Sequence, residues 1–355
     1  MQNRILFHNG KSLEVPVIPG GMGVGISLSS LAGAVMKEGG MGVISAAHPG
    51  YRKPDFWENS MICNIQAMHE EIAKAKEWAQ GKGLCGVNIM VASKDYEFYV
   101  KAAVDAQADA IISGAGLPMH LPAIVKDADI LLAPIVSSGR AAKLILKTWD
   151  RHHHRLPDFI VIDGSFAGGH LGFKKEDLIT NKAEPLEKIL ADVKALLPEF
   201  EERYQRQVPI FVAGGIYDAQ DIRHFCDLGA AGVQMGTRFI ATQECDASPA
   251  FKEVIVQAQK EDIELVKSPA GLPGRAVMTD FMRQVKEKRI APSHCIGCML
   301  PCKPATTPYC ISEALIHAVH GEVEQGLVFA GANAWRITEI VTVKQLMDEL
   351  KAAFI

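Results

Sequence analysis

The sequence IFVAGGI at residues 210–216 is a short apolar run that ends in two glycines, and an amphipathic helix pattern follows it. The sequence GVQMGTRF at residues 232–239 repeats this arrangement, with a glycine and a threonine after the apolar run. Glycines let backbone N–H groups approach an anion closely, and a helix N-terminus adds partial positive charge. Each stretch alone reads as an ordinary strand and turn. Together, at two successive strand ends, they predict the phosphate site that (β/α)8 barrels frequently carry there.

Six further apolar runs precede these two strands, and amphipathic helix patterns lie between them. The expected strands are residues 15–19, 42–46, 86–91, 110–113, 130–136, 159–163, 210–213 and 232–235. The helix patterns cover residues 28–37, 65–80, 96–106, 141–149, 186–197, 219–228 and 249–258. Apolar strands that alternate with helices are typical of a parallel sheet covered on both faces. Eight such units predict an α/β fold, a closed (β/α)8 TIM barrel, with an open doubly wound sheet as the alternative.

The chain has 355 residues, whereas a barrel of this kind takes about 250. We therefore expect a barrel domain at residues 1–260 and a C-terminal extension at residues 261–355. Two more helix patterns, at residues 311–320 and 343–354, fall in this extension. No low-complexity linker separates the two parts, so we expect the extension to pack on the barrel.

Composition excludes several classes of protein. The 37 Lys and Arg residues against 41 Asp and Glu give a net charge of −4, which offers no basic surface to nucleic acid or to a membrane. No stretch approaches the roughly 20 uncharged apolar residues that a membrane span needs. The N-terminus also lacks the apolar core of a secretory signal. We expect a cytoplasmic protein that acts on a small molecule; a homodimer is an open option.

Polar and glycine residues also end the earlier strands. The loop PGGMGVG at residues 19–25 can lie flat against a planar ligand, with Met22 as a soft apolar contact. Asn88 interrupts an apolar strand, and a buried amide needs a partner, so a core amide and a ligand-facing amide are equal interpretations. Ser113 ends the fourth strand immediately before another glycine.

One histidine stands among glycines in the sequence DGSFAGGHLG at residues 163–172, which ends the sixth strand. The carboxyl ends of barrel strands form the catalytic face of this fold. A neutral imidazole near pH 7 can take or give a proton. We therefore predict that His170 is the catalytic residue, and we expect most of the other eleven histidines to be surface residues.

These stretches resemble the nitronate monooxygenase family, which is related to the FMN-dependent enoyl-acyl-carrier-protein reductase II enzymes. The resemblance rests on PGGM at residues 19–22, GVN at 86–88, GGHLG at 168–172, the two late glycine stretches and SPAGLPGR at 268–275. These motifs span the expected barrel. The order GGHxG is the most specific of them, because glycine pairs occur in other phosphate-binding barrels.

The resemblance implies FMN in the barrel mouth. Its phosphate would be held by Gly214, Gly215, Gly236 and Thr237. Its ring and ribityl chain would lie along Gly20, Gly21, Met22 and Asn88. Ser113, Gly168 and Gly169 would complete the cofactor contacts, and His170 would stand over the reactive part of the flavin.

With FMN, a nitronate monooxygenase oxidises an alkyl nitronate to a carbonyl compound and nitrite, using O₂. An enoyl reductase would instead draw electrons from NADH or NADPH and reduce an enoyl thioester. The same residues fit both activities, because the flavin supplies the chemistry and the pocket selects the substrate. The monooxygenase is our preferred interpretation, and the enoyl reductase is the alternative. Phe166 stands where many relatives carry an acidic residue, so an acidic partner for His170 is expected from Asp163.

A cysteine cluster at residues 295–310 is a separate feature of the extension. Its spacing is C-x2-C-x3-C-x7-C, and its members are Cys295, Cys298, Cys302 and Cys310. Four thiolates this close can surround an iron–sulfur cluster or a zinc ion. Small buried hydrophobic residues and a redox-active thiol set are the alternatives.

Two functions of other classes are also considered. A phosphate-binding barrel without flavin, similar to inosine monophosphate dehydrogenase, would need a catalytic cysteine after the sixth strand, and residues 163–180 contain none. A non-catalytic flavin or metal sensor would fit the cysteine cluster, but it would not need the intact GGH sequence.

Overall fold

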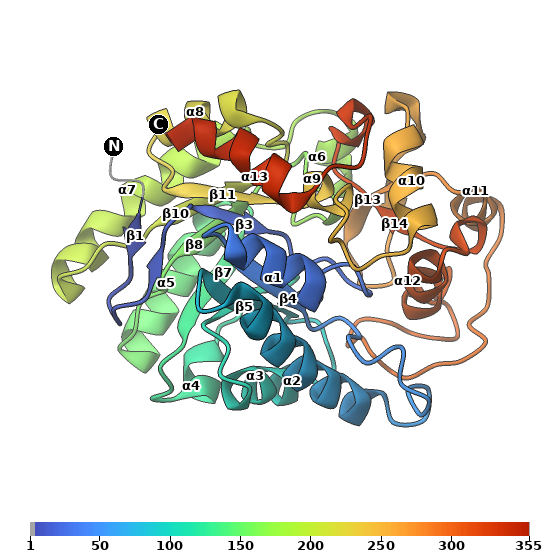
Figure 1. The fold of residues 1–355 in the computed structure, drawn as a ribbon, viewed down its shortest axis with the longest axis horizontal. Coiled ribbons are helices and arrows are strands. Elements are labelled where there is room, and N and C mark those ends of the chain that lie inside the picture. The colour runs from blue at the N-terminus through green and yellow to red at the C-terminus, as the bar shows by residue number, and fades with distance from the viewer. Residues whose placement is uncertain (1–3, 355) are drawn as a thin grey trace.

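Eight parallel strands form the centre of the computed structural model, which describes residues 4–354 (Figure 1). Their order in the sheet is β3 (Val17–Pro19), β11 (Gly232–Met235), β10 (Ile210–Ala213), β8 (Ile160–Asp163), β7 (Leu131–Val136), β6 (Ala110–Gly114), β5 (Leu84–Met90) and β4 (Met41–Ser45). The first and last of these, β3 and β4, also pack against each other. The sheet therefore curves into a (β/α)8 barrel, which confirms the predicted fold class and all eight expected strands.

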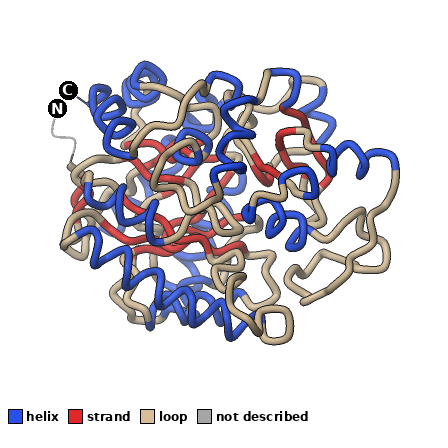
Figure 2. The backbone as a smooth tube through the Cα atoms, turned by 45° about the vertical axis from the view of Figure 1, so that its right-hand side comes forward, coloured by secondary structure: helices blue, strands red, loops and turns tan. Residues whose placement is uncertain are grey.

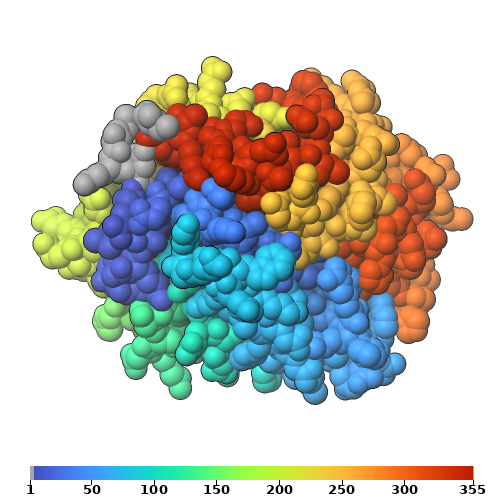
Figure 3. All heavy atoms as spheres, viewed as in Figure 1, coloured from blue at the N-terminus to red at the C-terminus, as the bar shows by residue number. Residues whose placement is uncertain are grey.

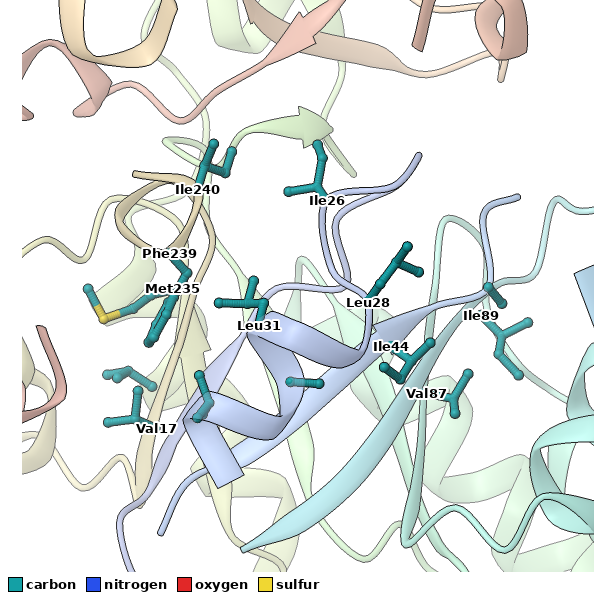
Figure 4. Close-up of a cluster of buried hydrophobic side chains, with 14 of the residues drawn as sticks. Val17, Ile26, Leu28, Leu31, Ile44, Val87, Ile89, Met235, Phe239 and Ile240 are labelled. Carbon is teal, nitrogen blue, oxygen red and sulfur yellow. The ribbon is translucent and has the colours of Figure 1, made fainter. Parts of the chain in front are cut away.

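Alternation along each strand separates two apolar layers. Ile18, Val161 and Phe211 point into the barrel, together with Phe7 and Leu13 from the hairpin of β1 (Ile5–Leu6) and β2 (Ser12–Leu13). Their neighbours along the strands point outward and pack under the helices. Figure 4 shows part of this outer layer around Leu31. Because both faces of every strand are buried, the strands read as continuous apolar runs.

Helices cover the outer face of the barrel. They are α1 (Ser29–Lys37), α2 (Ser60–Ala79), α3 (Tyr96–Asp105), α4 (Leu121–Val125), α5 (Gly139–His153), α7 (Leu186–Tyr204) and α8 (Ala219–Asp227). Six of these were expected from the sequence, whereas α4 was not, because five residues are too few to show a helical period. Helix α7 also continues past the expected end at residue 197, with Pro198 inside it.

The rest of the chain builds a second layer over one end of the barrel. It contains α9 (Thr237–Ile240), α10 (Pro249–Gln257), α11 (Asp280–Glu287), α12 (Ile311–His320) and α13 (Val343–Lys351). A small antiparallel sheet joins β12 (Ile263–Lys267), β13 (Pro273–Val277) and β14 (Val328–Phe329), and β13 also pairs with β9 (Gly169–His170). Figure 2 shows this sheet apart from the barrel strands. Short helix α6 (Lys175–Ile179) follows β9.

Helix α13 returns to the barrel from the end of the chain. It packs against α1 and α8 and so lies in the ring of outer helices. The ion pairs Arg238–Glu349 (2.7 Å) and Lys351–Glu38 (2.8 Å) lie at this contact. Figure 3 shows the C-terminal residues lying directly on the N-terminal ones. A domain boundary near residue 260 stays a prediction, since helices from both sides of it pack on the same barrel.

One carboxylate joins the second layer to the start of α1. Asp246 accepts the backbone N–H groups of Leu28 (3.0 Å), Ser30 (3.2 Å) and Leu31 (3.1 Å), which replaces the cap that Leu28 itself cannot supply. In the part of the chain that the structure describes, no helix has the length and apolar character needed to cross a membrane.

Candidate active site

A cavity of about 290 Å³ opens at the carboxyl ends of the barrel strands, at the lower end of the range for small-molecule pockets. It gathers all the predicted cofactor and catalytic residues except Ser113. Those in its wall are Gly20, Gly21, Met22, Asn88, Gly168, Gly169, His170, Gly214, Gly215, Gly236 and Thr237. These residues lie at or after the ends of five barrel strands, β3, β5, β8, β10 and β11, which the closure of the barrel brings to one place.

Ser113 lies outside the cavity wall. Its hydroxyl donates to the carbonyl of Ile89 at 2.9 Å and lies 2.8 Å from the hydroxyl of Tyr96. It is fully buried, so its side chain serves the packing of α3 on the barrel and does not face a ligand. The prediction of a cofactor contact at Ser113 is corrected in this way, and its neighbour Gly114 lines the cavity instead.

Glycines form a cradle in which the backbone itself is the wall. Gly214 (φ +90°) and Gly215 (φ +100°) have left-handed conformations that side chains rarely adopt. A Cβ on Gly21 would overlap the Cβ of Asn88, whereas a Cβ on Gly236 would meet only Met22 Sδ, at 3.5 Å. A flat ligand can therefore lie against bare backbone here. Asn88 lines this cradle, which favours the ligand-facing interpretation of its amide.

Gln234 is a cavity residue that the sequence analysis missed. Its Oε1 is buried and has no hydrogen-bond partner among the described residues. A buried acceptor without a partner costs free energy, so it is an observation that calls for a ligand donor. The signal was present in the sequence, because Gln234 interrupts the apolar run GVQM as Asn88 interrupts its own strand.

His170 sits on β9, where it is held by pairing with Gly274 of β13. Its Nε2 lies 2.7 Å from the hydroxyl of Ser268, and its ring meets Phe329 edge to face, with centroids 5.3 Å apart. Burial without a counter-charge lowers the pKa of His170 to about 4. The imidazole is therefore neutral at pH 7.

The partner of His170 is Ser268 and not the expected Asp163. Asp163 ends β8 in the cavity wall, where burial raises its pKa to about 7 although the charge of Arg275 acts in the opposite direction. Arg275 in turn donates to the carbonyls of Ser165 (2.8 Å) and Ala167 (2.6 Å). This contact holds the loop that leads to His170, whereas no hydrogen bond or ion pair joins Asp163 to the histidine among the described residues.

The second layer supplies more of the cavity wall than the sequence suggested. Cys298, Ser312, Phe329 and Asn333 line it from the second layer, and His48 lines it from the loop after β4. His48 is an exception to the expectation that most histidines other than His170 lie on the surface. No local pattern marks it, because its neighbours in the cavity come from segments about 250 residues later in the chain.

The four clustered cysteines differ in their exposure and surroundings. Among residues 4–354, no group of three or more His, Cys, Asp or Glu side chains is arranged to hold a metal ion. Cys295 is exposed, whereas the thiol of Cys298 lies in the cavity wall, 3.2 Å from the hydroxyl of Ser312. The assignment of Cys295, Cys298, Cys302 and Cys310 as iron–sulfur or zinc ligands therefore stays a prediction.

Comparisons with known proteins find one enzyme family and solved structures with the same fold. The family model for nitronate monooxygenase matches residues 7–352. A probable nitronate monooxygenase of Bacillus subtilis is 25% identical, over 96% of both chains. The structure of FabK from Thermotoga maritima is similar with a TM-score of 0.71 and 26% identity, covering 96% of this chain and 93% of that one. A nitroalkane oxidase from Streptomyces ansochromogenes shares the fold, with a TM-score of 0.70 and 20% identity, covering 98% and 97% of the two chains.

Proposed function

Since the chain belongs to the nitronate monooxygenase family and is an oxidoreductase, we propose that it binds FMN in this cavity and oxidises alkyl nitronates to carbonyl compounds and nitrite with O₂. The observation that carries the proposal is the convergence of the glycine cradle and His170 on one cavity. A planar cofactor and a proton-handling group are thereby available to the same substrate.

The residues of the cavity fit FMN. The cradle of Gly20, Gly21 and Gly236 would take the ring and the chain that leads to the phosphate, and Gly214 and Gly215 would let backbone groups approach that phosphate. The unpartnered Oε1 of Gln234 would accept a hydrogen bond from a hydroxyl or N–H group of the cofactor. When bound, FMN supplies the electron transfer, taking electrons from the substrate and passing them to oxygen.

His170 would act on the substrate from beside the cofactor. Its neutral ring can accept a proton from a nitroalkane or hold a nitronate oxygen by a hydrogen bond. Because Nε2 is bonded to Ser268, Nδ1 is the ring nitrogen left for the substrate. Phe329 and Ile135 give the wall apolar surface for an alkyl chain.

The second candidate function is an FMN-dependent reduction of an enoyl thioester by NADH or NADPH. The similarity to FabK, an enoyl reductase, over 96% of the chain favours it. The same cavity would serve both substrates. Product analysis separates the two. The proposal expects nitrite and oxygen consumption when the FMN-loaded protein receives propyl-2-nitronate, and no reduction of crotonyl-CoA by NADH. The reverse pattern would replace it with the enoyl reductase.

A further inference from the structure

Three polar side chains from distant segments meet in the cavity wall and have no part in the chemistry described so far. His48 follows β4, Ser312 lies in the first turn of α12, and Cys298 lies in the loop before that helix. Hydrogen bonds join them in a row. His48 Nε2 lies 2.8 Å from Ser312 Oγ, and Ser312 Oγ lies 3.2 Å from Cys298 Sγ.

Asn64 fixes the direction of this row. Its Oδ1 accepts the backbone N–H of Gly50 at 3.0 Å, and a backbone N–H can only donate. Its Nδ2 therefore faces the other way, where it donates to Tyr99 Oη at 3.0 Å and lies 3.3 Å from His48 Nδ1. Since an amide nitrogen only donates, His48 Nδ1 must accept, and the proton of the neutral ring is on Nε2.

The row continues to the sulfur. The Nε2–H of His48 donates to Ser312 Oγ, which still has its O–H donor and a second lone pair, so either Ser312 Oγ or Cys298 Sγ can donate across the 3.2 Å between them. When Ser312 donates its O–H to the thiol, the S–H of Cys298 remains the donor at the end of the row. Because Asn64 cannot release a proton, the row does not conduct protons. It orients the thiol.

The backbone around Cys298 is also held in place. Lys94 N donates to Cys298 O at 3.0 Å, and Leu300 N donates to Ala92 O at 2.9 Å. Ser93 and Met299 form an antiparallel bridge between these two bonds. The segment that carries Cys298 is thus fastened to the loop after β5, the strand whose Asn88 and Met90 line the same cavity.

We propose that Cys298 is a substrate-contacting residue, whose S–H donates to an anionic or carbonyl oxygen of the substrate. Ser312, His48 and Asn64 are positioning residues that aim this thiol. The inference rests on one part of the proposed function, namely that the substrate binds in this cavity. A nitronate and an enoyl thioester both offer an oxygen acceptor, so either substrate tests it.

The first test is steady-state kinetics on Cys298→Ala, Cys298→Ser and the matched control Cys302→Ala, a cysteine of the same segment that does not line the cavity. Loss of a neutral hydrogen bond to the substrate should raise KM roughly 3- to 10-fold in Cys298→Ala, with kcat nearly unchanged. Cys298→Ser keeps a donor and should restore KM, and Cys302→Ala should match the wild type. Ser312→Ala should raise KM in the same direction, because the thiol is no longer aimed.

The second test uses the wild-type holoenzyme and needs no turnover. Iodoacetamide alkylation of each cysteine is followed by mass spectrometry under anaerobic conditions, with propyl-2-nitronate in one arm and crotonyl-CoA in the other. Whichever compound is the substrate should slow the alkylation of Cys298 several-fold and leave that of Cys302 unchanged. This test stands even where a Cys298 variant fails to fold.

The outcomes separate this inference from the proposed function. If the wild type turns over crotonyl-CoA with NADH but not the nitronate, the proposed function fails. The kinetics of the Cys298 variants and the alkylation of Cys298 are then compared with crotonyl-CoA as the substrate. If the wild type turns over a substrate whose KM is unchanged in Cys298→Ala, the inference fails alone. If neither compound is turned over and neither slows alkylation, the inference fails as well.

Discussion

Burial at His170 decides which protonation state the cavity presents to a substrate. Among the described residues no carboxylate forms an ion pair with His170, and the hydroxyl of Ser268 orients the ring without supplying a counter-charge. The lowered pKa of His170 follows from this arrangement. The side chain is thus a neutral hydrogen-bonding group over the whole physiological range of pH.

Replacement of His170 by Ala should lower turnover of the nitronate by roughly 10²- to 10⁴-fold, the usual contribution of a positioned acid or base. FMN content should stay near that of the wild type, because the cradle consists of other residues. Enzyme kinetics and release of FMN on denaturation measure the two quantities. His152→Ala, on the exposed side of α5, is the control. A loss of FMN instead of turnover would show that the role of His170 is structural.

Stability should depend on pH through the same histidine. The folded pKa of about 4 lies below the usual 6.5, so the unfolded chain takes up the proton first as pH falls. The wild type should lose free energy of unfolding relative to His170→Gln between pH 6.5 and 4, by at most about 1.4 kcal/mol per pH unit. Urea denaturation of both proteins at several pH values gives this difference. The raised pKa of Asp163 has the opposite effect on stability, but Asp163 is present in both proteins, so its contribution cancels. A constant difference would mean an ordinary pKa at His170.

Sequence alone identified His170 because three glycines and a strand end surround it. It could not identify His48 as a cavity residue or Ser268 as the partner of His170, since their importance depends on contacts with segments far away in the chain. Gln234 is an intermediate case. Its place in an apolar strand marked it as unusual, but only the barrel geometry shows that its amide oxygen lacks a partner.

At the scale of elements, the strands fix the positions of the loops that line the cavity, and our proposal assigns cofactor binding to these loops. The glycines of these loops differ in what surrounds them. Gly21 packs against Asn88, whereas Gly236 faces open space in the cavity. The same substitution should therefore act on stability at one position and on ligand binding at the other.

Gly21→Ala should destabilise the fold by about 1–3 kcal/mol, the usual cost of overpacking. Gly236→Ala should leave stability nearly unchanged, because its φ of −101° suits alanine and its Cβ has only an ordinary contact with Met22. Its affinity for FMN should nevertheless fall roughly tenfold or more, which corresponds to about 1.4 kcal/mol. Denaturation of the apoprotein and FMN titration measure the two effects. Equal FMN affinity in Gly236→Ala and the wild type would contradict the placement of the cofactor.

The elements that the sequence predicted well are long or fully apolar. All eight barrel strands are of this kind, and their expected bounds agree with the structure to within two residues. The elements that it missed are helices α4, α6, α9 and α11, the hairpin strands β1 and β2, and the small-sheet strands β9, β12, β13 and β14. A two-residue strand such as β9 exists only because β13 pairs with it, and no local pattern encodes that pairing.

On the scale of the whole molecule, the C-terminal helix α13 packs against the N-terminal helix α1. The sequence predicted a helix at residues 343–354, but not that it would lie between α1 and α8, because such a contact joins residues more than 300 positions apart. The pattern at residues 249–258 forms α10, which packs on α9 and α12 instead. The compartment and the oligomeric state stay predictions.

Met347→Ala should therefore destabilise the entire barrel. Met347 is fully buried under α13, and removal of such a side chain typically costs about 2–5 kcal/mol. Lys344→Ala, on the exposed face of the same helix, should cost less than about 1 kcal/mol, because its ion pair with Asp348 is solvated. Chemical denaturation compares the two variants. Equal and small losses would show that α13 only lies on the surface.

The central claim is that this cavity holds FMN and that an alkyl nitronate gives it electrons. An absorbance spectrum of anaerobically purified protein, recorded before and after addition of propyl-2-nitronate and separately of NADH, tests this directly. We predict a flavin band that the nitronate bleaches and NADH does not. A protein that contains and binds no flavin, or a flavin bleached by NADH alone, would contradict it.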